Sequence, residues 1–328
     1  MNVDKNITIY VDGHPVNTKC RMQDGQIMVP FLFFKYAGVK VGMESKEKQI
    51  ILKRFNQMLK LYVNGRYAIY YPRGEDIRQK ELLKVIPTDT FLPLEYIAEK
   101  LGIEYQLNDN LSRSYLITSI YSVGKPEIIY KGETEQNRIA ITFEGVPGKE
   151  IACKLLNILK DKNVKATFFC LGERIKELSK VLEHIAKEGH EIGILTWSYS
   201  ELPKLTTYQL VKEIKKTKKH LESIIKNKTN LFRPINGRVT DADLITLNDL
   251  GQKVIGWNIN TADYLKLSDE DIEKKLSMEV SYGSIITHSN FYKDEALIEE
   301  KLDTLAKIIE KLQARDMEFV TVKQLLNI

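Results

Sequence analysis

From residue 138 onward, short apolar runs rich in β-branched residues alternate with longer amphipathic stretches. Short apolar runs are typical of buried strands, whereas apolar residues three or four positions apart are typical of helices. The pattern predicts strands at 138–143, 165–170, 190–196, 230–233, 253–259, 284–288 and 318–322, and helices at 149–162, 173–188, 206–226, 241–250, 269–280 and 294–315. Strict alternation of the two predicts a parallel β/α architecture, either an open sheet or a barrel, with functional residues at the carboxyl ends of the strands.

The first 120 residues show short β-rich segments and turn residues, and two of their segments are repeated. Residues 10–13 (YVDG) resemble residues 62–65 (YVNG), and each copy predicts a strand that ends in a two-residue hairpin turn. Residues 27–41 resemble residues 90–105, and each predicts a strand, a proline, a short helix, a glycine and another strand. We therefore predict a smaller, duplicated α+β domain in which the two copies pack as a pseudo-symmetric pair.

These two patterns divide the chain into a domain at residues 1–122, a linker at 123–137 and a larger domain at 138–328. The linker combines glycine, proline and charge with little periodicity, as a connecting segment should. The length agrees with this division, because 328 residues exceed the size at which one core usually keeps growing.

Composition narrows the possible partners and the possible compartments. With 43% hydrophobic and 28% charged residues, the chain can bury a sizeable core. Its net charge of +5 is small and scattered, which disfavours nucleic acid as a partner. No apolar run is long enough for a transmembrane segment or a signal peptide, so we expect a soluble chain. This expectation does not establish a cytoplasmic origin.

The cysteines and the first histidine predict no metal site. Cys20, Cys153 and Cys170 are odd in number and form no CxxC pair, so we interpret them as buried thiols rather than disulfides or zinc ligands. The duplicated pattern resembles the copper amine oxidase N-terminal-like domain, a stalk domain of bacterial envelope proteins, over residues 6–119. His14 is the only histidine in this half, and we therefore expect no copper there.

The ends of the predicted strands carry the second resemblance. The stretches are ITFEGVP (141–147), ATFFCLG (166–172), GHEIGILTWSY (189–199), FRPING (232–237), WNINTADY (257–264) and GSIITH (283–288). In this order they resemble NodB-type polysaccharide deacetylases, carbohydrate esterase family four, over residues 138–324. The resemblance implies a distorted seven-stranded parallel β/α barrel and metal-dependent removal of acetyl groups from N- or O-acetylated glycans.

The metal motifs of that family are degenerate in this chain. The family motif TFDDG, which supplies the general base and one metal ligand, corresponds here to TFEGV, so that Glu144 keeps a carboxylate at the base position and Gly145 offers no ligand. The two histidines of the family's HxxxH motif correspond to Leu195 and Tyr199. No two of the five histidines in the chain lie three or four residues apart. We therefore predict no metal cofactor, and zinc only if an unrecognised site exists.

The resemblance assigns roles to three further positions. Arg233 corresponds to the arginine that orients the base, and Asn236 to a residue whose backbone N–H helps to stabilise the oxyanion. His288 corresponds to the general acid, but it lies one residue nearer its preceding glycine than the family pattern usually has. Because a one-residue slip on a strand turns a side chain to the other face, this spacing matters for its role. The family's acidic partner of that histidine is replaced here by Asn260.

The remaining candidates concern substrate contacts, and each has a structural alternative. Trp197 and Trp257 are core or pocket-wall residues that could stack on sugars, and Asp263 belongs to a mainly structural family pair with its neighbour. Glu144 and Arg233 could form a strand-end ion pair, and His288 could be a hydrogen-bonded residue of the barrel mouth. Two residue groups have only structural interpretations: His190 as a structural residue, and the lysines within 215–219 as the solvated face of a helix.

Two principal hypotheses and a third follow. The first is a deacetylase-family pseudoenzyme that has lost the metal-dependent chemistry and binds an acetylated cell-wall glycan or an envelope protein. The second is an active carbohydrate deacetylase with an atypical site in which Glu144 is the base and His288 the acid. The third is a structural envelope or spore-coat protein. All three place the protein outside the cell or in its envelope, provided that an export signal has been removed.

Overall fold

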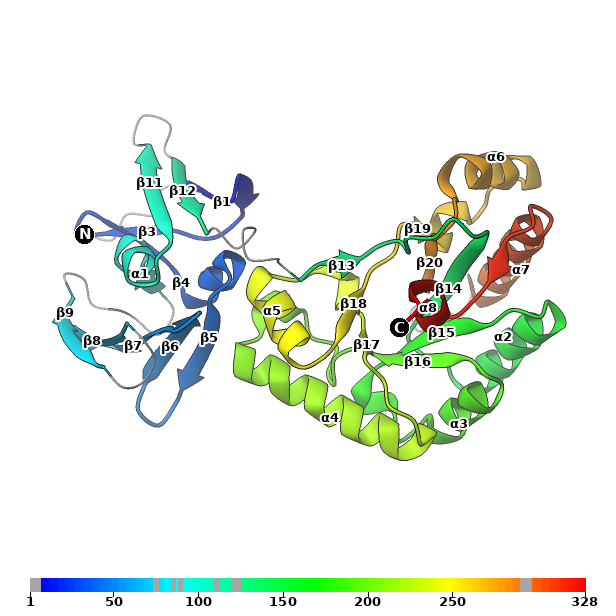
Figure 1. Ribbon diagram of the computed structural model, residues 1–328, viewed down its shortest axis with the longest axis horizontal. Helices are drawn as coiled ribbons and strands as arrows, with labels where there is room; N and C mark the ends of the chain where they lie inside the picture. Colours follow the sequence, from blue (N-terminus) through cyan, green and yellow to red (C-terminus); the bar gives the residue numbers. More distant parts are fainter. Residues whose placement is uncertain are drawn as a thin grey trace. The chain divides into compact units, whose positions relative to one another are not determined.

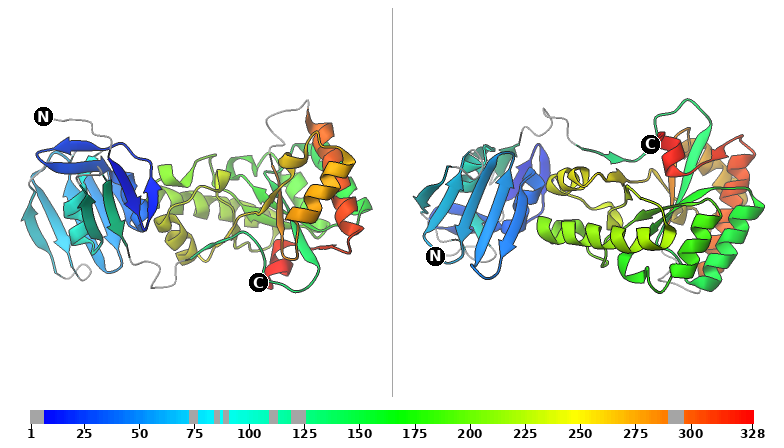
Figure 2. Two further views of the ribbon diagram at one scale, coloured as in Figure 1. Left: turned by 90° about the horizontal axis from the view of Figure 1, so that it is seen from above. Right: turned by 60° about the horizontal axis from the view of Figure 1, so that its bottom comes forward.

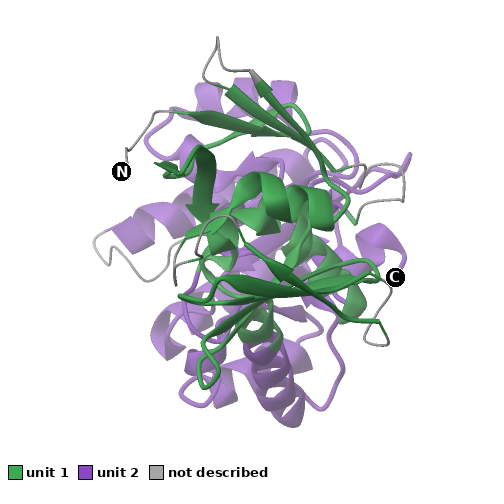
Figure 3. Ribbon diagram, turned by 90° about the vertical axis from the view of Figure 1, so that its left-hand side faces the viewer, with its two compact units in different colours: residues 1–126, 201–211, 238–250 green, residues 127–200, 212–237, 251–328 purple. Residues whose placement is uncertain are grey.

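The computed structural model describes residues 7–72, 77–83, 87, 91–108, 113–118, 126–289 and 297–328. The chain divides into two compact units, shown in Figures 1 and 3. Unit 1 comprises residues 1–126, 201–211 and 238–250, and unit 2 comprises residues 127–200, 212–237 and 251–328. Two segments from beyond residue 138 therefore group with unit 1.

The part of unit 1 before residue 126 is rich in strands, with two short helices among its described residues. Its strands are β1 (Thr8–Val11), β2 (His14–Val16), β3 (Arg21–Gln23), β4 (Gln26–Pro30), β5 (Lys40–Glu44), β6 (Gln49–Arg54), β7 (Gln57–Tyr62), β8 (Tyr67–Tyr71), β9 (Gln79–Leu82), β10 (Phe91–Pro93), β11 (Glu104–Asn108) and β12 (Arg113–Ile117). They form sheets in the orders β11-β12-β1-β2, β10-β4-β3 and β5-β6-β7-β8-β9. The helices of the repeats are the 3-10 helix η1 (Phe31–Ala37) and α1 (Leu94–Lys100).

The longer predicted repeat is confirmed. Strand β4, η1 and β5 correspond to β10, α1 and β11, and the helices are followed by Gly38 and Gly102 with φ of 72° and 60°. Such left-handed backbone is what glycine supplies at the end of a helix. The two copies meet where β4 and β10 pair antiparallel.

The shorter repeat folds differently in its two copies. Val11 pairs with His14 across a two-residue turn in which Asp12 and Gly13 both have positive φ, as predicted. The second predicted two-residue turn is wrong, because four residues separate β7 from β8. Within this longer loop, the Gly65 N–H donates a hydrogen bond to the Tyr62 carbonyl.

A buried ion pair joins distant segments within unit 1. The Lys35 ammonium lies 2.7 Å from the Asp243 carboxylate, with both side chains almost fully buried. It also donates to the carbonyls of Leu202 and Leu205, each at 2.6 Å. Since a buried charge is costly without partners, these three oxygens explain how the ammonium is tolerated, although burial still lowers the pKa of Lys35. The pair anchors segments 201–211 and 238–250 in this unit.

Unit 2 contains a parallel sheet. Its strands are β13 (Ile128–Ile129), β14 (Arg138–Glu144), β15 (Ala166–Cys170), β16 (Glu191–Ile194), β17 (Leu231–Phe232), β18 (Lys253–Ile255), β19 (Ile259–Asn260), β20 (Ile285–Ser289) and β21 (Glu318–Phe319). They are ordered β13-β18-β17-β16-β15-β14-β20-β19, with β21 paired to β14. Among the described strands the two ends of this order do not pair, so the sheet is a half-barrel.

The helices of the predicted alternation are present with small shifts. They are α2 (Lys149–Asp161), α3 (Ser179–Lys187), α4 (Thr207–Ile225), α5 (Asp241–Asp249), α6 (Asp269–Glu279), α7 (Ile298–Gln313) and the short α8 (Val322–Leu326). Short 3-10 helices are η4 (Gly172–Arg174), η5 (Leu202–Lys204), η6 (Ile235–Gly237) and η7 (Thr261–Tyr264). Figure 2 shows α2 and α7 gathered on the outer side of the sheet.

Two predictions are corrected in unit 2. The sheet has nine strands rather than seven, because two-residue strands β13 and β19 extend it. The predicted strand 253–259 divides into β18 and β19, and the predicted helix 173–188 begins only at Ser179 after η4. Such short pieces leave no periodicity in a sequence, because two residues do not define an alternation.

The two faces of the half-barrel sheet carry different sets of side chains. The inner face carries one apolar cluster, which includes Ala140, Phe169, Leu195, Leu231 and Ile255. On β14 the side chains alternate, so Phe143 lies on the opposite, outer face and stacks on Phe168. This alternation decides which predicted site residues can meet.

Candidate functional site

The inner face at the carboxyl ends of the strands is organised around Arg233, which follows β17. Its guanidinium is fully buried and donates to the hydroxyls of Thr142 and Thr287 at 2.7 and 3.1 Å. It donates further to the carbonyls of Ile255 and Gly256 at 3.2 and 2.8 Å. Burial lowers the pKa of Arg233 to about 9, which leaves it charged at neutral pH. The arginine therefore binds together three strands and the chain after β18.

Aromatic rings complete this cationic centre. The Arg233 guanidinium carbon lies 4.3 Å from the ring centroid of Phe169 and 5.3 Å from that of Trp257. A guanidinium over an aromatic face is stabilised by the ring's electron density. Phe169 also occupies the space beside Gly193, where an added Cβ would lie 2.7 Å from the ring. Bulky rings thus fill the inner face below the strand ends.

Glu144 ends β14 on the same face as Thr142, and it is half-buried. Its register partner on β15 is Phe169, whose ring lies under the Arg233 guanidinium. The charge of Glu144 raises the pKa of Arg233 against the larger effect of burial. Burial first, and then the charge of Glu144, also raise the pKa of the Tyr199 hydroxyl. The structure therefore brings Glu144, Arg233 and Tyr199 together.

His288 lies on the other face of the sheet. Its register partner on β14 is Phe143, and the two rings meet edge to face at 5.8 Å between centroids. Its Nδ1 is hydrogen-bonded with the Thr261 hydroxyl at 2.7 Å. Burial, and then the positive charge of Lys301 on α7, lower the pKa of His288 to about 3. The imidazole is thus neutral at ordinary pH and is not on the face that holds Glu144 and Arg233.

The positions that correspond to the family's metal ligands do not form a ligand set. Gly145 has no side chain and a φ of 91°. Leu195 is 2% exposed and belongs to the inner apolar cluster, whereas Tyr199 is 46% exposed. A zinc ion needs three or four nitrogen, sulfur or carboxylate ligands, which these residues do not offer. Within the described ranges, no group of three histidine, cysteine, aspartate or glutamate side chains could hold a metal ion.

Residues 195–199, at the position of the HxxxH motif, contact helix α4 instead of forming a metal site. The Ser198 N–H and hydroxyl both donate to the Glu213 carboxylate, at 2.8 and 3.0 Å. The Trp197 ring lies 3.5 Å from the Lys216 ammonium and 4.8 Å from the His220 ring. Trp197, predicted to contact substrate, therefore packs on helix α4 rather than beside Arg233.

The other predicted substrate-binding residues are spread along the strand ends. Trp257 packs on the inner apolar cluster, next to Arg233 and close to Gly237. Asn236 is exposed in η6 with a left-handed φ of 56°, a conformation that asparagine tolerates better than most residues. Asp263 is exposed in η7. Of this set, Trp257 is the one placed beside Arg233.

Sequence reasoning missed the threonines that support both buried bases. Thr142 and Thr287 accept from Arg233, and Thr261 faces His288. The available signal was a threonine inside an otherwise apolar strand, in RIAITFE and in IITHS. A buried hydroxyl must find a partner, so such a threonine indicates a polar group nearby.

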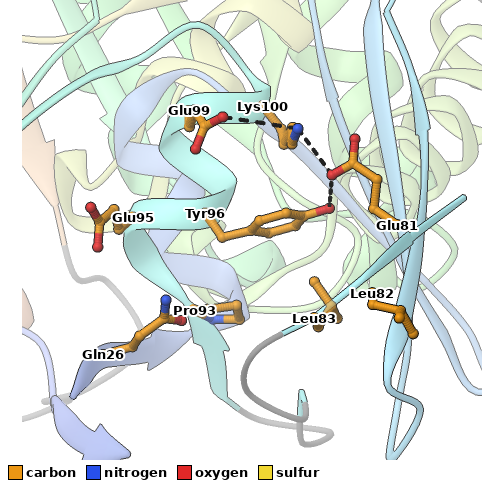
Figure 4. A pocket seen from close by; sticks show the side chains of 9 residues that line it. All are labelled: Gln26, Glu81, Leu82, Leu83, Pro93, Glu95, Tyr96, Glu99 and Lys100. Carbon is orange, nitrogen blue, oxygen red and sulfur yellow. Dashed lines mark hydrogen bonds and ion pairs between the residues drawn. The ribbon is translucent and has the colours of Figure 1, made fainter. Parts of the chain in front are cut away.

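A separate cavity of about 270 Å³ lies in unit 1, between β9 and α1 (Figure 4). Two of its charged lining residues are paired, because the Lys100 ammonium lies 2.9 Å from the Glu81 carboxylate. The Tyr96 hydroxyl donates to the same carboxylate at 3.1 Å, and burial and Glu81 together raise the pKa of Tyr96. These contacts stabilise the edge of the sheet against the helix.

Comparisons with known proteins agree with this architecture. Residues 131–255 match the polysaccharide deacetylase family, and residues 10–116 match the copper amine oxidase N-terminal domain. The chain therefore contains a polysaccharide deacetylase domain preceded by a copper amine oxidase N-terminal-like domain, which confirms both resemblances. No helix of the described ranges is both long and apolar enough to cross a membrane.

Individual relatives and solved structures similar to this chain include peptidoglycan deacetylases and a pseudoenzyme. A peptidoglycan-N-acetylglucosamine deacetylase of Bacillus cereus is 29% identical over 232 residues, which are 70% of this chain and 82% of that protein. A crystal structure of a peptidoglycan N-acetylglucosamine deacetylase superposes with a TM-score of 0.57 and 27% identity, over 63% of this chain and 95% of that one. A CE4 family pseudoenzyme from Bacillus anthracis shares the fold, with a TM-score of 0.54 and 22% identity over 61% of this chain and 69% of that one.

Proposed function

We propose that this chain is a non-hydrolytic member of the polysaccharide deacetylase family that binds an acetylated cell-wall glycan at the mouth of its half-barrel. The observation that carries the proposal is Leu195, an apolar core residue at a position where the family has a metal-binding histidine. Without a metal, a bound water keeps its high pKa and is a poor nucleophile toward an amide. The family fold can persist without the family reaction, because fold and catalytic site are separable.

The acid side of the reaction is impaired as well. A general acid must reach the leaving group from the same cleft as the base. His288 faces Thr261 and Lys301 on the outer face, and with a pKa of about 3 it is not the imidazolium that could act as a general acid at neutral pH. This supports the loss of hydrolysis over an atypical mechanism that pairs His288 with Glu144.

We infer the class of glycan from the names of the relatives. We infer the residue that contacts it from the structure of this chain. The Bacillus cereus relative is named for peptidoglycan N-acetylglucosamine, which gives an acetylated cell-wall glycan as the ligand and the cell envelope as the location. Trp257, half-buried beside Arg233, offers a ring on which a sugar face can stack. We expect binding without turnover.

The test measures binding and acetate release on the same ligand. Chitotetraose should bind the full chain, and Trp257→Ala should weaken binding at least tenfold, about 1.4 kcal/mol. Tyr282→Ala is the matched control, because Tyr282 is an exposed aromatic residue before the amino end of β20. Zinc-supplemented protein should release no acetate, under conditions in which the Bacillus cereus enzyme does.

Two outcomes would replace the proposal. Acetate release that disappears in Glu144→Ala would identify an active deacetylase with an atypical site. Absence of both binding and acetate release would favour a structural envelope role, and an interaction with envelope material that survives deletion of residues 126–328 would assign that role to the N-terminal domain.

A further inference from the structure

Helix α4 presents one face made of lysines. Lys212, Lys215, Lys216 and Lys219 are exposed, and Lys226 follows directly after the helix, also exposed. Residues three and four positions apart lie on the same side of a helix, so the first four form a continuous row. The opposite side of the helix is apolar and buried, with Leu210, Ile214 and Leu221 at most 1% exposed. We call the five exposed lysines the lysine face.

The lysine face is not neutralised by the helix's own acids. Glu213 is occupied by the Ser198 N–H and hydroxyl, and Glu222 by the Thr229 N–H and Lys218. In the part of the chain that the structure describes, none of the five lysines forms an ion pair with a carboxylate. Five like charges along one helix repel one another.

Several lysines on other helices of unit 2 are paired. On α2, α6 and α7 these are the pairs Lys154–Glu299, Lys275–Glu279, Lys307–Asp269 and Lys311–Glu273. Exposed lysines without such a partner, for example Lys149 and Lys274, also occur on other helices, so what distinguishes α4 is that four of them lie in one row. A concentration of one sign of charge on one helix attracts a partner of the opposite sign.

We infer that the lysine face binds a linear phosphodiester polymer of the cell envelope. At 1.5 Å per residue, the row from Lys212 to Lys226 is about 20 Å long, and a linear polyanion can place several phosphates along it. A membrane surface fits less well, because the apolar side of α4 is buried in the protein and leaves no side chains to insert into lipid. The assignment of this polymer to the cell envelope rests on the proposed function. The inference that the lysine face binds a polyanion does not depend on that function.

The experiment measures the binding of end-labelled poly(glycerol phosphate) to the full chain as salt is varied. Lysine contacts with phosphates release counterions, so log K should fall with log salt with a slope of about −2 to −3.5. Between about 50 and 200 mM salt, this slope is a loss of affinity of about 10- to 100-fold. The quadruple variant K212Q/K215Q/K219Q/K226Q should bind at least tenfold more weakly and with a shallower slope.

The matched control is K154Q/K275Q/K307Q/K311Q, which removes the same number of positive charges from paired lysines. It should stay within threefold of the wild type, and K212R/K215R/K219R/K226R should also keep its affinity. Equal weakening in both glutamine variants would overturn the proposal, because net charge alone would then explain binding. Tighter binding of phosphatidylglycerol vesicles or of oligo(dT) than of the polymer would overturn the choice of partner. Chitotetraose binding should not change in any of these variants, so failure here is distinguishable from failure of the proposed function.

Discussion

Arg233 and His288 are both buried basic side chains at the carboxyl ends of strands in one sheet. They differ in the face of the sheet on which they lie and in their charge. Arg233, on the inner face, is surrounded by two hydroxyls and two carbonyls and keeps its charge. His288, on the outer face, lies against the ring of Phe143 and near the cation of Lys301, and it is neutral. The comparison shows that side-chain register, rather than residue type, decides which of two candidate groups lies on the inner face of the sheet.

The largest expected effect comes from removing the inner cation. Arg233→Met leaves the hydroxyls of Thr142 and Thr287 and two carbonyls without their donor, and unsatisfied buried groups are costly. We expect a loss of about 3 to 5 kcal/mol in the free energy of unfolding. Guanidinium unfolding followed by tryptophan fluorescence reports unit 2, because both tryptophans, Trp197 and Trp257, lie there.

Arg138→Met is the matched control for that variant. Arg138 is 35% exposed and pairs with Glu318 on the surface, where an ion pair contributes at most about 1 kcal/mol. Equal destabilisation by the two substitutions would contradict the central role given to Arg233.

The second effect tests the outer face through pH. Because the folded-state pKa of His288 is about 3, well below its ordinary value, the unfolded chain takes up a proton first as pH falls. The stability that depends on neutral His288 is therefore complete above pH 6.5 and is lost on going down toward pH 3. Between pH 7 and 4 the loss is about 2 to 3 kcal/mol.

His288→Gln isolates this effect from other groups. His190, whose burial lowers its pKa to about 4, contributes similarly in both proteins and cancels in the difference. The difference in urea unfolding free energy between wild type and variant should shrink as pH falls. A difference that is constant from pH 7 to 4 would show that His288 is protonated or accessible in the folded state.

The third effect concerns the lost metal position on the inner face. Leu195→His should cost about 2 kcal/mol at neutral pH, because it places an unpaired polar ring in the apolar cluster. Adding Gly145→Asp and Tyr199→His should make thermal stability depend on zinc, since binding to the folded state alone stabilises it. Leu195→Ala should show no response to zinc. Zinc stabilisation of the wild type would reveal a site that these three positions do not explain.

The smallest effect tests whether Glu144 lies near Tyr199. Glu144→Gln removes the charge that, after burial, raises the pKa of Tyr199, so the phenol should ionise at lower pH. We expect a change in interaction free energy below about 1 kcal/mol. Near-ultraviolet titration, with Tyr199→Phe in both backgrounds to identify the signal, measures it. An unchanged titration would show that Glu144 points away from Tyr199.

Most of the fold could be predicted from the sequence. The strands β14, β15 and β20 are continuous apolar runs, and their two-sided burial is typical of parallel sheets. The prolines and glycines of the longer repeat marked the limits of its helices correctly. Two-residue strands such as β19 were missed, because local pattern is too short to report pairing that depends on a neighbouring strand.

For the candidate site, the sequence supplied candidate residues but not their contacts. The motif positions indicated Glu144, Arg233 and the absence of metal ligands, and the spacing before His288 already raised the question of its face. The acceptors of Arg233 come from three separate strands, and the partners of Lys35 lie more than 160 residues away in the chain. No local pattern encodes such neighbours.

The sequence by itself determined the duplicated N-terminal domain, the parallel alternation of strands and helices, and the absence of the family's metal ligands at their usual positions. Each of these features depends only on residue identity or on the short-range periodicity of apolar residues. The tertiary structure alone decided that Leu195 lies in the inner core, that Trp197 is held by α4, and that His288 faces outward. Strand alternation turns each side chain to one face or the other, and only the pairing of strands decides which face is the inner one.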